Sequence, residues 1–353
     1  MESSESVQMI RDSVGAIAPQ GAGLKRVRAL RGDGAGFDPA VWRQIVDLGW
    51  LSLRLEESCG GLGLGVAELC AIAEELGAAL VPEPVLAVAA VVPLLDGPRR
   101  AAVLAGSLIV VPAWCDAPSS AAAMSRPQIS DGKVSGRKIV VPAAAVADAF
   151  VVTVAEGAVL VERGAPGLSI ELSKTQDGGQ LGTLDFHDVP CVAVGGAVAG
   201  NVREALHELA LAHSAYLLGA SERAYQMTLD YLGVRKQFGR FIGSFQVLQH
   251  RAAEAKIQLA MSRAVLDEAV ATIAQEASSE DRLRAAGRAM ARVSDTAMLI
   301  ARESVQMHGA IGITDEHDIG LYCRKILSLY NQFGSASSHR ARYLATLTPT
   351  ERT

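Results

Sequence analysis

The chain has 353 residues, of which 50% are hydrophobic, so it can bury a substantial core and is expected to fold. Its 33 Lys and Arg residues are outnumbered by 38 Asp and Glu residues, which gives a formal net charge of -5. Without an excess of positive charge the chain has little means to neutralise a phosphate backbone, so nucleic-acid binding is not expected.

The five cysteines are scattered, with no CxxC pair and no histidine cluster at the spacing of metal ligands. They are interpreted as reduced thiols of a cytoplasmic protein, and no metal site is expected. The first residues, MESSESVQMIRDSVG, lack the apolar stretch of a secretory signal. Elsewhere Pro, Glu or Asp interrupts the apolar stretches before they reach about 18 residues, so no membrane span is expected.

Residues 1–105 are expected to form a helical domain. The segments VWRQIVDLGWLSL and VAELCAIAEELGAALV place apolar residues at helical spacing, with Gly and Pro at the joins. Between them lies ESCGGLGLG, residues 57–65, which lacks both the GxGxxG order and the Lys-Ser/Thr of a phosphate-binding loop. A tight turn ahead of a helix is therefore the favoured interpretation over phosphate binding.

Two further domains are expected after the first. Residues 106–200 contain short runs such as KVSGRKIVV and LGTLDFHDVP, in which apolar and polar residues alternate between turn residues, and this pattern favours a small antiparallel sheet or barrel. Residues 201–353 return to helical spacing in successive long stretches, which predicts an antiparallel bundle of four helices. The fold class predicted is therefore α+β.

Two segments of the C-terminal half carry a more specific pattern. Residues 231–255, YLGVRKQFGRFIGSFQVLQHRAAEA, are similar to the Arg-x-Gln-Phe-Gly stretch of the FAD-dependent acyl-CoA dehydrogenase family. Residues 306–325, QMHGAIGITDEHDIGLYCRK, are similar to that family's Gln-x-His-Gly-Gly segment. Weaker matches at 57–65 and in GRKIVVPAAAVADAFVV extend the resemblance over nearly the whole chain, and the order of helical, β and bundle domains agrees with it.

The resemblance implies two groups of cofactor-binding residues. Arg235, Phe238 and Gln246 correspond to residues that reach across a subunit interface to the FAD of a neighbour. A planar guanidinium suits the pyrophosphate of FAD because it forms charge-assisted, often bidentate hydrogen bonds. Gln306, Gly309 and Ala310 correspond to the segment near the adenine end. The alternatives are a solvated Arg beside a core Phe, and a simple turn at GAIG.

The positions of the family's catalytic base are not matched. In the commonest arrangement a Glu precedes a Gly near the C-terminus, but here Phe333 stands in that place. In a second arrangement the Glu lies early in the first long bundle helix, where this chain has Leu209. Glu208 is one residue away, about 100° around a helix, and is only a weak candidate. His339 follows the first base position and is interpreted as structural or exposed.

The middle domain also departs from the pattern that holds the flavin ring. Family members place Trp and Thr on a strand beside the ring, whereas this chain has Val140 and Pro142, and Pro has no N–H to donate. The preceding loop of the family corresponds to VVPAWCDAPSS, residues 110–120. Trp114 in this segment could stack on a flavin or lie in the core.

The family residues that this chain matches are those that contact a neighbour's FAD. The family residues that it does not match are those that contact the chain's own flavin ring and substrate. Related heteromeric enzymes of bacterial steroid side-chain catabolism pair two such subunits, so the resemblance implies the base-lacking companion of a second dehydrogenase subunit. The expected partners are an acyl-CoA, that subunit and an electron-transfer protein. The alternatives are a self-sufficient dehydrogenase, assembled with itself and using an atypical base, and a helical interaction protein without flavin.

Overall fold

The computed structural model describes residues 5–17, 23–31, 36–116, 126–155, 157–194, 198–275 and 278–347. Its contacts divide the chain into two compact units. The bundle unit comprises Met1–Lys25, Cys70–Val81 and Ala210–Thr353, and the sheet unit comprises Arg26–Leu69 and Pro82–Leu209. In the part of the chain that the structure describes, no helix is long and apolar enough to cross a membrane.

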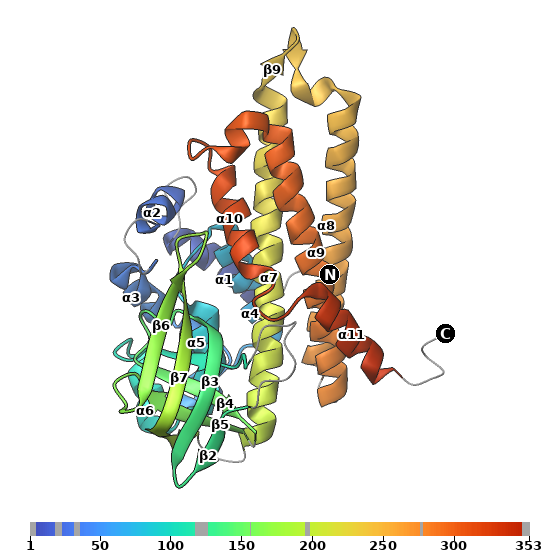
Figure 1. Ribbon diagram of the computed structural model, residues 1–353. Coiled ribbons are helices and arrows are strands. Elements are labelled where there is room, and N and C mark those ends of the chain that lie inside the picture. The colour runs from blue at the N-terminus through green and yellow to red at the C-terminus, as the bar shows by residue number, and fades with distance from the viewer. Residues whose placement is uncertain are drawn as a thin grey trace. The chain divides into compact units, whose positions relative to one another are not determined.

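The sheet unit contains two four-stranded sheets, which appear in green in Figure 1. One has the order β1 (Val110–Ala113), β4 (Ala149–Val154), β5 (Gly157–Glu162) and β8 (Val192–Ala193). The other has the order β2 (Gln128–Ser130), β3 (Lys133–Pro142), β7 (Gln180–Pro190) and β6 (Leu168–Lys174). The alternating pattern correctly predicted antiparallel pairing, with the difference that β1 and β4 run parallel.

Short helices accompany the sheets of this unit: α3 (Pro39–Asp47), η1 (Trp50–Ser52), η2 (Glu57–Cys59), α5 (Val85–Val91), η3 (Val92–Leu94) and α6 (Gly97–Leu104). Asp38 caps α3, because its carboxylate accepts a hydrogen bond from the backbone N–H of Ala40 at 2.9 Å. The glycine-rich residues 57–65 form η2 and the loop that follows. A Cβ on Gly61 would lie 2.1 Å from the carbonyl oxygen of Leu55, so only glycine fits there.

The bundle unit consists mainly of helices (Figure 1). They are α1 (Glu5–Ile17), α4 (Val66–Ala78), α7 (Val198–Val234), α8 (Gln246–Ala274), α9 (Ser279–His308), α10 (Ile319–Leu329) and α11 (Ala336–Thr346). Helix α2 (Gly23–Leu30), the first residues of α4 and the first twelve of α7 cross the division between the units. The long helices agree with the helical spacing that the sequence shows in successive long stretches of residues 201–353.

Two glycines let α4 and α7 cross in direct backbone contact. A Cβ on Gly77 would lie 2.0 Å from the carbonyl oxygen of Tyr216, and a Cβ on Gly219 would lie 2.0 Å from that of Glu74. The buried Glu74 side chain is held beside this crossing by Arg11, at 2.7 Å, and by Arg263. The crossing brings a segment near the N-terminus into the same core as the C-terminal helices.

Candidate functional site

A tight hairpin connects α7 to α8 and projects one aromatic side chain into solvent. Strands β9 (Lys236–Gln237) and β10 (Arg240–Phe241) pair through the turn Phe238–Gly239, whose φ angles are +52° and +75°. Such a turn favours Asn-Gly, and a non-glycine residue in the left-handed region is disfavoured by about 1 kcal/mol. Phe238 is nevertheless 90% exposed. A large apolar ring held in water on strained backbone is typical of a group that contacts a ligand or partner.

The hairpin concentrates positive charge. Arg235, Lys236 and Arg240 are all exposed, and the Arg235 side chain forms no ion pair within the described residues. The other two lie over aromatic rings: Lys236 Nζ is 4.6 Å from the centre of Phe241, and the Arg240 guanidinium is 4.0 Å from that of Phe245. The hairpin therefore presents cations above a small aromatic cluster.

Helix α8 begins at the exposed Gln246, after the hairpin and the short helix η4 (Ile242–Ser244). Its N-cap, Phe245, has no side chain that can accept a hydrogen bond from the first turn. The positive end of the helix dipole, with its unsatisfied N–H groups, therefore adds to the charge of the neighbouring cations. Together these features form a surface suited to an anionic group such as a pyrophosphate.

The second sequence segment ends α9. Gln306 lies exposed in its last turn, and Gly309 follows with φ +66° and ψ -142°, a conformation that glycine adopts far more readily than other residues. Apart from its chain neighbours, no atom of the described residues lies within 4 Å of the position that a Cβ of Gly309 would take, so the backbone here is open to approach. Ala310 is also exposed, at the start of η5 (Gly309–Ile313).

One ring contact brings the two segments together. The side chains of Tyr231, one turn before Arg235, and His308, directly before Gly309, are stacked with their centres 4.5 Å apart. The backbone N–H of Arg235 donates to the carbonyl of Tyr231 at 2.9 Å, so the end of α7 is fixed relative to this stack. We call the region so assembled the bundle tip, defined by Arg235, Phe238, Gln246, Gln306, Gly309 and Ala310; β9 marks it at the top of Figure 1.

Apolar residues stand at both expected positions of the catalytic base, and the neighbouring carboxylate of Glu208 is paired with an arginine. Phe333 lies against the buried His213, with ring centres 4.8 Å apart, and His213 Nε2 is 3.0 Å from the carbonyl oxygen of Leu329. Burial lowers the pKa of His213 to about 4. In the sheet unit Leu209 is buried and both carboxylate oxygens of Glu208 accept hydrogen bonds from Arg54, at 2.7 and 2.9 Å.

The strand expected beside a flavin ring keeps an irregular backbone without the expected side chains. Val140 has a φ of +56°, which is rare for a β-branched residue, at a register shift between β3 and β7. Nearby, the fully buried Lys138 donates to Asp116 and, at 2.7 Å, to Thr153, and burial lowers its pKa. Trp114 is half-buried at the end of β1, and residues 117–120 of the expected loop lie outside the described residues.

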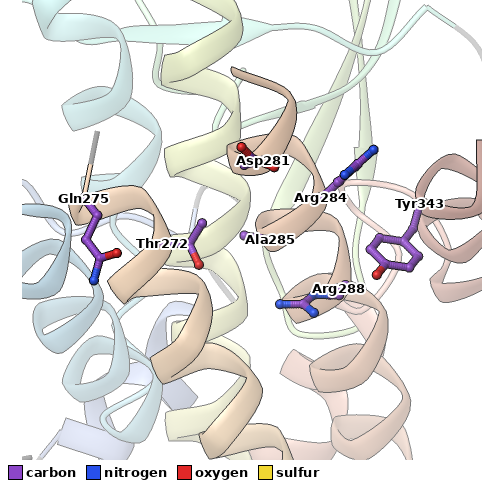
Figure 2. Close-up of a pocket in the computed structure, with 7 residues that line it drawn as sticks. All are labelled: Thr272, Gln275, Asp281, Arg284, Ala285, Arg288 and Tyr343. Carbon is purple, nitrogen blue, oxygen red and sulfur yellow. The ribbon is translucent and has the colours of Figure 1, made fainter. Parts of the chain in front are cut away.

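Two cavities lie between α8, α9 and α11, of about 370 and 440 Å³. Figure 2 shows the first, which is lined by Arg288 of α9 and Tyr343 of α11, among others; the Arg288 guanidinium carbon is 5.9 Å from the centre of the Tyr343 ring. Arg288 is paired with Glu268 at 2.6 Å, and Arg284 with Glu280 at 2.9 Å. The buried His339 lines the second cavity. No group of three or more metal-ligating side chains occurs in the described part of the chain.

Sequence reasoning singled out the exposed residues of the bundle tip but not the side chains that support them. Arg240 and Phe245 could have been noticed, because KQFGRFIGSF alternates basic and aromatic residues on both sides of a turn. Tyr231 and His308 lie within the two segments that carry the resemblance, but nothing in the sequence indicates their contact, because they lie far apart in the chain and meet only in the folded bundle.

Two family models match the chain. Residues 4–95 match the acyl-CoA dehydrogenase N-terminal domain, and residues 199–347 match the acyl-CoA dehydrogenase C-terminal domain. Among characterised proteins, the acyl-CoA dehydrogenase FadE27 of Mycobacterium tuberculosis is 30% identical over 81% of this chain and 82% of its own length.

Solved structures agree over nearly the full length. A variant of the steroid ACAD Tcur3481-Tcur3483 superposes with a TM-score of 0.86 at 27% identity, covering 96% of both chains. The ChsE4-ChsE5 complex from Mycobacterium tuberculosis contains a chain with a TM-score of 0.85 at 26% identity, covering 98% of this chain and 99% of that one. The sequence motifs, the arrangement of helices and sheets, and these matches together show that this chain belongs to the acyl-CoA dehydrogenase family.

Proposed function

We propose that this chain is the companion subunit of a two-protein, FAD-dependent acyl-CoA dehydrogenase, in which it supplies the bundle tip to an FAD held mainly by a related subunit. The observation that carries the proposal is the tip itself. Phe238 is strained and 90% exposed, Arg235, Lys236 and Arg240 form no ion pair within the described residues, and the backbone at Gly309 is open. These features match what a dinucleotide requires.

The residues at the tip fit the pyrophosphate and adenine portion of FAD. Arg235 would bind the pyrophosphate, because its exposed guanidinium forms no ion pair within the described residues and belongs to the connection that leads to the positive end of α8. Phe238 and Gln246 would contact the cofactor from the same side. Gln306, Gly309 and Ala310 would line its adenine end, where the missing Cβ of Gly309 allows close approach.

The residues on the flavin-ring side do not fit a complete site in this subunit. Pro142 has no N–H for a ring oxygen or nitrogen, and Val140 offers only an apolar side chain. At the base position Phe333 cannot accept a proton. We assign Glu208 a structural role, because its charge is engaged on both oxygens by Arg54.

The chemistry therefore divides between two chains. Bound FAD supplies a hydride acceptor for the dehydrogenation of an acyl-CoA between its α and β carbons. This chain binds and orients the nucleotide portion through Arg235 and its neighbours. The related subunit then has to provide the base, the surroundings of the flavin ring and the acyl pocket.

The comparisons support a substrate class and a partner. The Tcur3481-Tcur3483 protein is a steroid ACAD and ChsE4-ChsE5 is a complex, so we propose a steroid-derived acyl-CoA as substrate and a second dehydrogenase subunit as partner. Reoxidation of the flavin would fall to an electron-transfer protein. All of these components are proposed to act in the cytoplasm.

Purification with and without a partner tests the proposal. The chain should carry no flavin when produced alone, and should acquire the absorbance of oxidised flavin near roughly 450 nm when co-produced with a related dehydrogenase subunit. Flavin binding and acyl-CoA turnover by the chain alone would instead establish a self-sufficient dehydrogenase. A stable complex with that subunit that lacks FAD would favour the flavin-free interaction protein.

Substitution of Arg235 tests the tip. Arg235→Ala should weaken FAD binding in the complex by about 1.5 to 3 kcal/mol, which is roughly 10- to 150-fold. Arg235→Lys should give a smaller loss, because it keeps the charge without the planar fork. The control is Arg340→Ala on α11, whose partner is the exposed Asp295. Equal FAD retention in all three variants would remove the assignment of Arg235.

A further inference from the structure

Three rings meet beneath the bundle tip. Besides its stack on Tyr231, the His308 ring lies 4.6 Å from the ring of His317, which in turn meets Tyr231 edge-on at 5.9 Å. Each ring comes from a different segment: Tyr231 from the last turns of α7, His308 from the end of α9, and His317 from the residues ahead of α10. His308 is the central member, because it contacts the other two face on or at a tilt.

Hydrogen bonds fix the protonation of the central imidazole. His308 Nδ1 lies 2.7 Å from the carbonyl oxygen of Ser304. A carbonyl can only accept, so Nδ1 carries the proton and Nε2 holds a lone pair. Nε2 is buried and has no hydrogen-bond partner among the described residues. The backbone N–H of Ile319 donates to His317 Nδ1 at 3.1 Å, which also fixes that ring.

We propose that His308 is the positioning residue of the bundle tip, a neutral imidazole whose stack on Tyr231 holds the segment bearing Arg235 against the turn bearing Gly309 and Ala310. This inference rests on the proposed function, since it concerns how the FAD-facing residues are kept in register. It assigns His308 no contact with the cofactor. Its role is to act through the two segments that it joins.

The stack of His308 on Tyr231 requires a neutral imidazole. A second proton would have to reside on Nε2, which is buried, has no acceptor among the described residues and lies on a ring that packs against His317. The groups that face His308 are the Tyr231 ring from α7, His317 from the segment before α10, and Ser304 from its own helix. The carboxylates closest along the chain are already paired, Glu303 with Arg251 at 2.7 Å and Asp315 with Arg324 at 2.5 Å.

Acid should therefore loosen the tip. Burial lowers the pKa of His308 below its ordinary value of about 6.5. His308 stays neutral while it is stacked on Tyr231 and binds a second proton once the stack opens. The FAD affinity of the complex should therefore be constant above about pH 6.5 and fall below it. His308→Phe keeps a planar ring that cannot be protonated, and should retain FAD at pH 7.5 while losing this part of the acid dependence.

A double-mutant cycle on FAD affinity tests the contact in the assembled complex. His308→Ala and Tyr231→Ala should each weaken FAD binding roughly tenfold at pH 7.5, and the double variant should be little worse than either, because both remove the same stack. Tyr231→Phe, which keeps the ring, should restore binding. Additive losses in the double variant, or an unchanged acid dependence in His308→Phe, would overturn the proposal.

Hydrogen exchange separates this proposal from the one on which it rests. In the chain itself, His308→Ala should speed the exchange of the amides of residues 309–313, while the amides in the middle of α9 keep their protection. If the wild-type complex holds no FAD at any pH, the proposed function fails and this measurement still decides whether His308 braces the turn. Unchanged exchange at residues 309–313 would directly refute the proposed positioning role of His308.

Discussion

Phe238 and Phe333 show how much the surroundings of a residue decide its role. Both positions were identified from the resemblance to the family, and the sequence alone could predict that a Phe at 333 removes a base. It could not predict that Phe333 packs on His213, because that contact joins α7 to the residues after α10. Nor could it predict that Phe238 is exposed on strained backbone, since an apolar residue is usually buried.

The strain at Phe238 leads to a prediction with opposite signs in two states. Phe238→Asn should relieve the left-handed backbone and raise the Tm of the isolated chain by roughly 1–2 °C. In the complex the same change should lower FAD content severalfold, because the ring is lost. Differential scanning fluorimetry and flavin absorbance measure the two effects.

Phe238→Leu is the matched control. Leucine tolerates the left-handed region no better than phenylalanine, so the Tm of the isolated chain should not rise, while FAD content should still fall. A Tm gain with leucine would show that loss of the exposed ring, and not relief of the turn, accounts for the effect of asparagine.

At the level of elements, the sequence predicted kinds of structure better than it predicted neighbours. Apolar spacing gave the helices and alternation gave the strands, because both patterns are local. The crossing of α4 and α7 depends on Gly77 and Gly219, which lie far apart in the chain and meet only in the fold. The same holds for the bundle tip. Its two motifs can be recognised in the sequence, but the stack of Tyr231 on His308 that joins them cannot.

The crossing yields a prediction with a control in the same helix. Gly219→Ala should destabilise the chain by about 1–3 kcal/mol, because its Cβ would meet the backbone carbonyl of Glu74 at 2.0 Å and force the helices apart. Gly233→Ala, where no atom of the described residues outside the helix's own backbone lies within 4 Å of the new Cβ, should stabilise α7 by about 0.5–1 kcal/mol. Chemical denaturation compares them, and equal effects would argue against the tight crossing.

Across the whole molecule, buried histidines tie stability to pH. Burial lowers the pKa of His213 and of His339 to about 4, compared with roughly 6.5 in an unfolded chain. Below pH 6.5 the unfolded chain binds more protons than the native one, so stability is fully present above that pH and falls as the pH drops toward 4. At pH 5 each of these two histidines should lower the free energy of unfolding by about 2 kcal/mol.

Thermal unfolding between pH 7.5 and 4.5 measures this dependence. The Tm of the chain should be nearly constant down to pH 6.5 and then decline, and His339→Asn should make the decline shallower. Replacement of the exposed His250 by Asn should leave the profile unchanged. A Tm that rises on acidification would contradict the burial of neutral imidazoles.

The discontinuous make-up of the bundle unit has a consequence for how the protein is made. The sheet unit ends at Leu209, so all of its residues have left the ribosome while the long helices are still being synthesised. Residues of α1 and α4, by contrast, emerge early and have to wait for Gly219 and its neighbours. Until then their apolar faces lack a partner, and nascent chains stalled before α7 is complete should be especially prone to bind chaperones.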